Sequence, residues 1–173
     1  MKFDVSIVQT RYASPLGLMV VAATAKGLAG LWFEGQKHLP DTSAWPHQPG
    51  HPVLAQAVRQ LDEYFAGQRT QFDLPLDLQG GTVFQRSVWA ALLKIPPGQT
   101  TSYGRISQGI GKPAAVRAVG AAVGRNPVSV IVPCHRVLGT GGALTGYAGG
   151  LERKTALLRL EGAAPSGHRA SIP

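Results

Sequence analysis

The alternation of apolar and polar residues near the start of the chain predicts a small antiparallel sheet. Phe3, Val5 and Ile7 alternate with polar neighbours, and two further apolar runs follow over 18–23 and 28–33. Such alternation is typical of strands that bury one face. Turn residues separate the three runs, which favours short hairpin connections. We therefore predict a three-stranded meander that begins near Phe3.

A helix is predicted next, after a long loop over 34–51 that lacks periodicity. Pro52 suits the first turn of a helix, and Gly67 suits its C-terminal end. The apolar positions between them have helical spacing: Leu54, Val58, Leu61 and Phe65. No residue pattern in 1–80 indicates chemistry, so we interpret this half as a scaffold domain.

The second half, 81–173, has helical periodicity. Thr82 and Gln85 form a capping-box pattern ahead of an amphipathic helix. Ser102 is placed to cap a short helix, and Pro113 is placed to open another after a glycine turn. Two short helices joined in this way are typical of a helix-turn-helix, although many αα-hairpins share the pattern and bind nothing.

The helix predicted from Pro113 is built almost entirely from small residues, and Arg117 is its one long side chain. A helix that reads bases in the major groove would carry several Asn, Gln or Arg residues. A bare helix can instead approach the minor groove, with Arg117 filling the gap left by an extruded nucleotide. The alternative is an Ala-rich helix that packs closely on a neighbour. The residues expected at a DNA surface are Arg117, Ala114, Ala115, Ala118, Gly120, Arg125 and Arg136.

The apolar run 128–132 predicts a buried strand that Pro133 ends, so that Cys134 and His135 would lie at its exit. Cys134 is the only cysteine in 173 residues, which excludes an internal disulfide, and no zinc-ligand spacing is present. A free cysteine often packs as a small apolar residue. An adjacent imidazole and nearby guanidinium groups favour the thiolate, however, and indicate a nucleophile.

The charge of the chain is uneven. Residues 1–80 carry six basic and seven acidic residues, whereas 81–173 carry eleven basic and two acidic ones, a net +9. No acid lies between Asp77 and Glu152. A basic half of this kind favours a polyanionic partner. No run approaches the roughly 18 apolar residues of a membrane span, and the start does not resemble a signal peptide, so we expect a cytoplasmic protein without a membrane partner.

Several motifs around Cys134 together resemble one family. They are the P-C-H-R-V run 133–137, the R-A-V-G run 117–120, Asn126-Pro127, and the G-Y-A-G-G run 146–150. In this order they are similar to the O6-alkylguanine-DNA alkyltransferases. The resemblance is specific from about Phe84 to Glu161 and loose over the first 80 residues.

This resemblance implies two domains. Residues 1–80 would form an α/β domain with a small antiparallel, ribonuclease-H-like sheet. Residues 81–173 would form a mainly α domain with a winged helix-turn-helix, in which 163–173 would be a disordered tail.

The resemblance also implies a role for each matched residue. Cys134 would accept the alkyl group, His135 would activate it through a water, and Glu161 would orient the imidazole. Tyr103 would help to rotate the nucleotide and protonate N3 of guanine, and Asn126 would act as a hinge. The implied substrate pocket consists of Val137, Tyr147, Ala148, Gly149 and Ser129. Ala148 and Ser129 depart from some relatives, which have serine and proline there.

The function implied is direct-reversal DNA repair. Cys134 would take one alkyl group from O6-alkylguanine, or from O4-alkylthymine, in double-stranded DNA, with base flipping through the minor groove. No cofactor or metal is implied, and the protein would be a monomer able to cluster on DNA. With no second cysteine to resolve a thioether, the protein should act once. A cysteine hydrolase, a non-catalytic lesion-binding module and a winged-helix regulator remain the competing interpretations.

Overall fold

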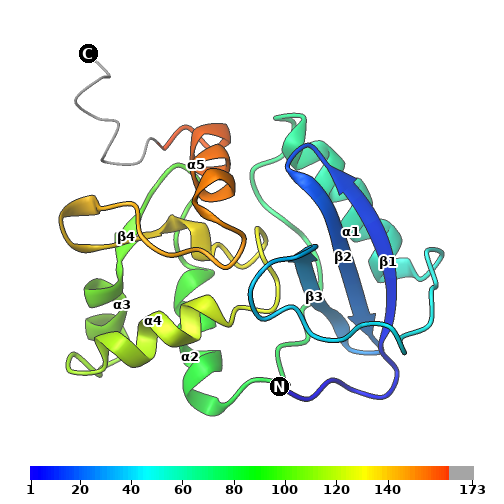
Figure 1. The fold of residues 1–173 in the computed structure, drawn as a ribbon, viewed down its shortest axis with the longest axis horizontal. Helices are drawn as coiled ribbons and strands as arrows, with labels where there is room; N and C mark the ends of the chain where they lie inside the picture. The colour runs from blue at the N-terminus through cyan, green and yellow to red at the C-terminus, as the bar shows by residue number, and fades with distance from the viewer. Residues whose placement is uncertain (164–173) are drawn as a thin grey trace. The chain divides into compact units, whose positions relative to one another are not determined.

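The computed structural model in Figure 1 describes residues 1–163 and contains two compact units. The first unit comprises Met1–Thr82 and a short distant segment, Pro127–Ser129. The second comprises Val83–Asn126 and the chain from Val130. Of the predicted tail, Ala163 is buried in a cluster with Leu138 and Leu158, so it is not part of a disordered tail. The remainder, 164–173, lies outside the described residues.

The first unit contains the predicted three-stranded antiparallel meander, in the order β1 (Val8–Ser14), β2 (Gly17–Thr24) and β3 (Gly27–Phe33). The predicted start at Phe3 is wrong, because β1 begins at Val8. Val5 is fully exposed, and the Phe3 ring packs edge-to-face on Trp32 with centroids 5.8 Å apart. Phe3 and Ile7 pack in the same apolar cluster without forming a strand, so the alternation before Val8 reflects this packing.

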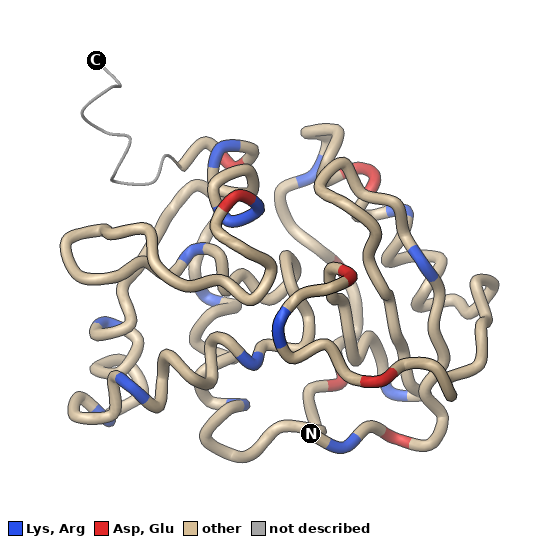
Figure 2. The backbone as a smooth tube through the Cα atoms, viewed as in Figure 1, with Lys and Arg blue, Asp and Glu red and all other residues tan. Residues whose placement is uncertain are grey.

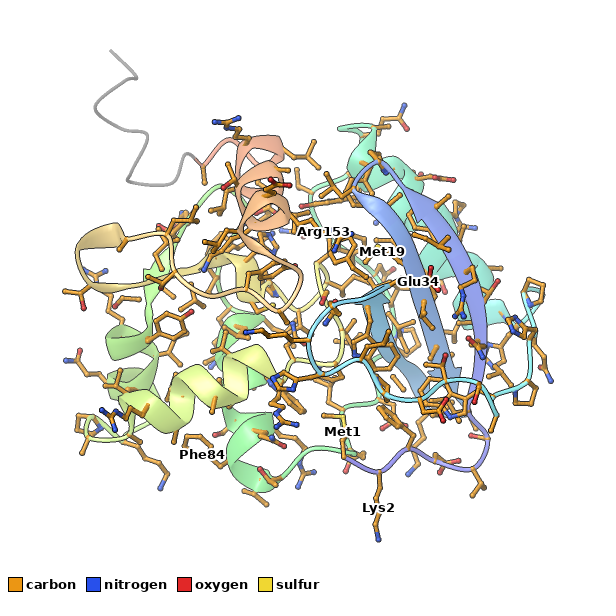
Figure 3. All side chains as sticks on the ribbon, in the orientation of Figure 1. Met1, Lys2, Met19, Glu34, Phe84 and Arg153 are labelled. Carbon is orange, nitrogen blue, oxygen red and sulfur yellow. The ribbon has the colours of Figure 1, made fainter. Side chains whose placement is uncertain are left out.

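Helix α1 (Pro52–Phe65) packs against all three strands, as Figure 1 shows. Both predicted ends are confirmed: Pro52 opens the helix, and Gly67 follows it with φ +75°. The face turned to the sheet buries Leu54, Ala57, Leu61 and Tyr64. Side chains fill the interior of this unit, where Met19 is fully buried, whereas Lys2 is exposed (Figure 3).

The outer edge of β3 is completed by the segment 127–129. Leu31 donates its backbone N–H to the Pro127 carbonyl (2.8 Å) and accepts from the Ser129 N–H (2.9 Å). The strand predicted over 128–132 is wrong beyond this point, because Val130 has φ +71° and turns the chain. A β-branched residue rarely adopts this conformation, which persists where the surrounding structure enforces it. All five residues of the run are nevertheless buried, as the apolar pattern predicted.

The second unit is mainly helical. Its elements are α2 (Val83–Leu92), β4 (Thr101–Ser102), α3 (Tyr103–Gly109), α4 (Val116–Gly124), the 3-10 turn η1 (Cys134–Arg136), β5 (Val137–Leu138), the 3-10 turn η2 (Thr140–Gly142) and α5 (Leu151–Leu160). Helices α2 and α4 are joined by the fully buried Trp89, whose Nε1 donates to the Ala122 carbonyl at 2.8 Å. The short strands β4 and β5 pair in parallel and connect the start of α3 to the end of η1.

The two short helices occur as predicted, with one shift in a boundary. Ser102 caps α3, since its Oγ accepts from the Arg105 N–H at 3.1 Å. Helix α4 begins at Val116 and not at Pro113. The intervening residues form a turn in which the Ala115 N–H donates to the Lys112 carbonyl. Ala114 and Ala115 therefore precede α4 and do not lie within it.

Candidate active site

Cys134 is the first residue of η1 and is 5% exposed. Burial raises the pKa of its thiol, while a side-chain hydrogen bond from Asn126 and the charge of Lys154 act in the opposite direction. The net shift is upward, so the resting thiol keeps its proton. A nearby positive charge thus favours the thiolate, as expected, but burial outweighs its effect on the resting thiol. A nucleophile in this position needs a base.

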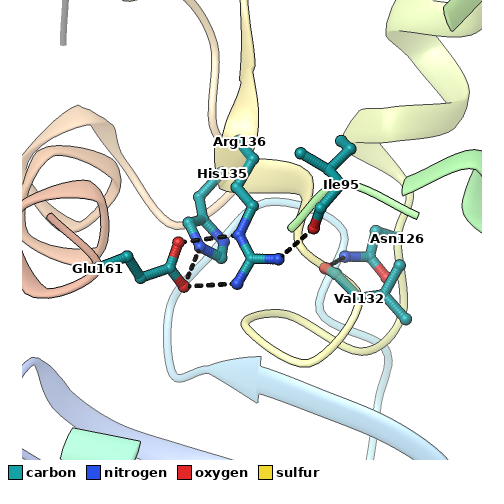
Figure 4. A network of polar contacts seen from close by, with 6 residues as sticks. All are labelled: Ile95, Asn126, Val132, His135, Arg136 and Glu161. Atoms are coloured by element: carbon teal, nitrogen blue, oxygen red, sulfur yellow. Dashed lines mark hydrogen bonds and ion pairs between the residues drawn. The ribbon is translucent and has the colours of Figure 1, made fainter. Parts of the chain in front are cut away.

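The next residue, His135, has a side chain that can serve as a base, and it is fully buried. Its Nε2 lies 2.9 Å from Oε2 of Glu161, as Figure 4 shows. Because a carboxylate only accepts hydrogen bonds, Nε2 carries the proton and Nδ1 carries the lone pair. Within residues 1–163, Nδ1 is buried without a hydrogen-bond partner. Burial lowers the pKa of His135, so the imidazole is neutral at pH 7 and can accept a proton at Nδ1.

Asn126 closes the loop that leads to the thiol. Its Nδ2 donates to the Val132 carbonyl at 2.7 Å, across the turn made by Val130. Its side chain also bonds to the Cys134 thiol. The Asn126 amide thus forms hydrogen bonds with both the loop backbone and the Cys134 sulfur. Because Asn126 directly follows the C-cap of α4, these bonds connect the loop to the end of that helix.

Arg136 does not lie at the surface, which corrects the expectation that it contacts DNA. Its side chain is 8% exposed. The guanidinium donates from Nε and Nη2 to the two carboxylate oxygens of Glu161, both at 2.8 Å, and from Nη1 to the Ile95 carbonyl at 2.6 Å (Figure 4). Its donors are therefore directed into the interior of the unit, where the Glu161 carboxylate is buried.

Lys154 is a buried residue of this site that the sequence interpretation missed. It is 0% exposed, and its Nζ donates to the carbonyls of Val137 (2.6 Å), Thr145 (2.6 Å) and Gly146 (3.0 Å). Burial lowers the pKa of Lys154 to about 8. Three acceptors match the three protons of an ammonium. A signal was present, since Lys154 lies three and four residues before two buried leucines on one face of α5.

Tyr103 opens α3 and is half-buried. A Cβ atom built on Gly120 of α4 would lie 3.9 Å from its ring, and one built on Gly146 would lie 3.8 Å from its hydroxyl. The ring therefore lies between α4 and the glycine-rich segment that follows η2. Burial raises the pKa of Tyr103, so the phenol keeps its proton at neutral pH. It can act there as a proton donor.

The expected pocket residues occupy different environments. Val137 is fully buried in β5, and Gly149 is buried as well. Tyr147 and Ala148 are half-buried in the same segment. Ser129 is buried where its N–H bonds to Leu31, within the first unit.

The exposed face of α4 is nearly bare. Val119, Ala122 and Val123 are buried, whereas Arg117 and Ala118 are exposed. Of the other residues expected at a DNA surface, Ala114 and Arg125 are exposed, and Ala115 and Gly120 are half-buried. In Figure 2, acidic residues of the second unit occur only on α5 and at its end, whereas basic residues are spread over the other helices.

Across residues 1–163, no group of three His, Cys, Asp or Glu side chains could hold a metal ion. Over the same range, no helix has the length and apolar character needed to span a membrane.

Comparison with known proteins gives matches over both units. The family model of the 6-O-methylguanine DNA methyltransferase ribonuclease-like domain matches residues 7–78, and that of its DNA-binding domain matches 83–163. A methylated-DNA–protein-cysteine methyltransferase of Mycolicibacterium paratuberculosis is 51% identical over 148 residues, covering 86% of this chain and 88% of the relative. A protein of the same name from Methanosarcina acetivorans is 47% identical over 152 residues, with coverages of 87% and 96%.

A solved structure agrees with these matches. The crystal structure of Mycobacterium tuberculosis OGT in complex with DNA superposes with a TM-score of 0.81 at 48% identity, covering 92% of this chain and 95% of that chain. The resemblance drawn from the motifs around Cys134 is thereby confirmed. The chain belongs to the family of methylated-DNA–protein-cysteine methyltransferases.

Proposed function

We propose that this protein repairs DNA by moving the alkyl group of O6-alkylguanine in a duplex onto Sγ of Cys134, once per molecule. The proposal rests above all on three buried side chains, those of Cys134, His135 and Glu161. Their arrangement places a neutral imidazole, with its proton on the carboxylate side, next to the only thiol of the chain.

The chemistry follows from these protonation states. His135 takes the thiol proton at Nδ1, through one bridging water, and the thiolate attacks the alkyl carbon. A carbon–sulfur bond forms as the carbon–O6 bond breaks, and the electron pair of the broken bond stays on guanine. Tyr103 gives its proton to N3, so that guanine leaves as a neutral base. Asn126 and Lys154 stabilise the transient thiolate, since both lower the pKa of the Cys134 thiol.

A winged helix-turn-helix that contains α3 and α4 is proposed to bind the DNA. The bare exposed face of α4 allows its backbone to approach the minor groove, and Arg117 fills the space of the nucleotide that rotates into the site. The complex of the M. tuberculosis relative with DNA supports DNA as the partner. O4-alkylthymine, which carries its alkyl group on a similar exocyclic oxygen, is a second proposed substrate. The protein is proposed to act as a monomer that can cluster along DNA.

Mass spectrometry after mixing the protein with excess O6-methylguanine duplex tests this function. We expect the Cys134 peptide to gain the mass of one methylene group, and methyl transfer to stop at one equivalent of protein. A thioether cannot be cleaved by thiol exchange, and no second cysteine is present to attempt it. Turnover beyond one equivalent would overturn the proposal in favour of a cysteine hydrolase.

The proposed role of Arg117 makes a first prediction. Arg117→Ala should slow repair of the duplex by about 10- to 100-fold, because extruding a nucleotide costs a few kcal/mol that the arginine helps to offset. Its reaction with the free modified base should be unchanged, since no gap needs filling. Single-turnover rates on the two substrates provide the measurement, with Arg159→Ala, an exposed arginine on α5, as the control. Equal losses on both substrates would contradict this role.

A second prediction concerns pH. Methyl transfer should slow as pH falls, because a proton at Nδ1 of His135 removes the lone pair that accepts the thiol proton. Since burial lowers the pKa of His135 from its ordinary 6.5, the midpoint of this decline should lie below 6.5. Single-turnover rates measured between about pH 5 and 8 give the midpoint. His135→Gln protein should be slow throughout and lack this transition. A midpoint above 6.5 would show that the site stabilises an imidazolium.

A further inference from the structure

We propose that Arg136 is a positioning residue for the base: its guanidinium neutralises and orients the Glu161 carboxylate, so that His135 remains an uncharged acceptor for the thiol proton. This inference rests on the proposed function of His135. It assigns Arg136 a role in preparing the nucleophile instead of a contact with DNA.

The hydrogen bonds of the Arg136 guanidinium fix the orientation of the Glu161 carboxylate. Two parallel hydrogen bonds of 2.8 Å join Arg136 to the two oxygens of Glu161, which fixes the plane of the carboxylate. A third bond, from Nη1 to the Ile95 carbonyl at 2.6 Å, fixes the guanidinium itself. Oε2 of Glu161 is thereby held 2.9 Å from Nε2 of His135 (Figure 4). The carboxylate cannot rotate away from the imidazole without breaking its two hydrogen bonds to Arg136.

The position of Glu161 requires a counter-charge. Its side chain is 2% exposed, and it caps the C-terminus of α5, where the helix dipole disfavours a negative group. A buried carboxylate needs a cationic partner or a proton. Within η1 only Arg136 and His135 can supply one. Because Arg136 already supplies the positive charge, the Glu161 carboxylate does not need a protonated His135 as its partner.

Burial is the largest influence on the pKa of His135 and lowers it, and the charged groups around the ring act in both directions. Glu161 raises its pKa, whereas the charges of Arg136 and Lys154 lower it along with burial, and the Cys134 thiol beside it is protonated at rest. If Arg136 is removed, Glu161 loses the cation bound to its carboxylate, and its attraction for a proton on the ring is opposed only by burial and by the charge of Lys154. His135 should then become an imidazolium at neutral pH, with no lone pair at Nδ1.

Arg136→Gln tests the proposal in the full-length protein. Nitrogen-15 NMR of the unreacted protein without DNA follows the titration of His135. We expect its midpoint to rise by about one to three pH units, the usual effect of a nearby carboxylate that is no longer compensated. The acid limb of the methyl-transfer rate should move by the same amount, and raising the pH should restore the rate. Arg159→Gln, at an exposed arginine of α5, should change neither quantity. An unmoved His135 midpoint would overturn the proposal.

A separate readout tests the alternative that Arg136 contacts phosphate. The salt dependence of duplex binding should be the same for Arg136→Gln and the unchanged protein. A decrease of about one in the slope of log affinity against log salt would indicate a lost phosphate contact and would overturn the proposal.

A double variant keeps the test decisive if Arg136→Gln does not fold. Arg136→Met combined with Glu161→Gln removes both buried charges, so the unit should fold, and His135 should remain neutral at pH 7. An imidazolium in this double variant would overturn the proposal. The titration does not depend on methyl transfer. If the unchanged protein takes up no methyl group, the proposed function fails, while the NMR midpoints still decide what Arg136 does.

Discussion

Cys134→Ser protein is expected to take up no methyl group from an O6-methylguanine duplex, while it binds that duplex as tightly as the unchanged protein. The hydroxyl of serine is a far weaker acid than a thiol, and His135, whose pKa is already lowered, cannot remove its proton. Loss of an activated nucleophile reduces rates by at least about 10⁴-fold. No other cysteine can substitute for it.

The measurement combines mass spectrometry of the reacted chain with a duplex-binding titration. Since serine has nearly the volume of cysteine, the thermal midpoint should change little, which separates lost chemistry from lost folding. His135→Gln, which keeps the thiol but removes the base, should react slowly and still reach one equivalent. Methyl uptake at another residue of the Cys134→Ser protein would contradict the assignment of the acceptor.

The second large effect is expected for stability. Lys154→Met should lower the free energy of unfolding by about 3–5 kcal/mol, because three backbone carbonyls lose a charged, buried donor, a loss larger than the gain from no longer desolvating one ammonium. The affected carbonyls belong to Val137 in β5 and to Thr145 and Gly146 in the segment between β5 and α5. Methionine has a similar length, so packing alone should not account for the change.

Urea unfolding followed by tryptophan fluorescence provides this measurement. Lys94→Met is the matched control, since Lys94 is an exposed lysine in the same unit, and its substitution should leave the transition in place. Coincident transitions for Lys154→Met and the unchanged protein would show that the three hydrogen bonds contribute no net stability.

Local signals in the sequence predicted a large part of the fold. Pro52 and Gly67 marked the ends of α1, and Ser102 marked the start of α3, because caps and turns depend on residues close in sequence. The adjacency of Cys134 and His135 likewise led to the reactive centre that we propose. These features were predictable because the residues that interact to produce them lie within a few positions of one another in the sequence.

Features that depend on distant partners were not predictable in the same way. The apolar run before Pro133 correctly indicated burial, but burial does not distinguish a strand from the turn that Val130 makes. Arg136 was assigned to DNA because a positive residue is assumed to be exposed, while its partner Glu161 lies 25 positions later. For Lys154 the helical spacing signals burial, but it does not identify the three carbonyls that accept its hydrogen bonds. The choice of partner for a charge is a tertiary property that periodicity does not contain.

The pairing of Leu31 with Pro127 and Ser129 has a consequence for synthesis of the protein on the ribosome. When Thr82 has been made, the first unit still lacks the segment that covers the edge of β3 at Leu31. Roughly 50 more residues must be added, which takes about 2–10 s at ordinary translation rates. During that interval an unpaired strand edge is available to other nascent chains. A fragment ending at Thr82 would keep this edge open permanently, so co-translational aggregation should be more severe for the fragment than for the whole chain.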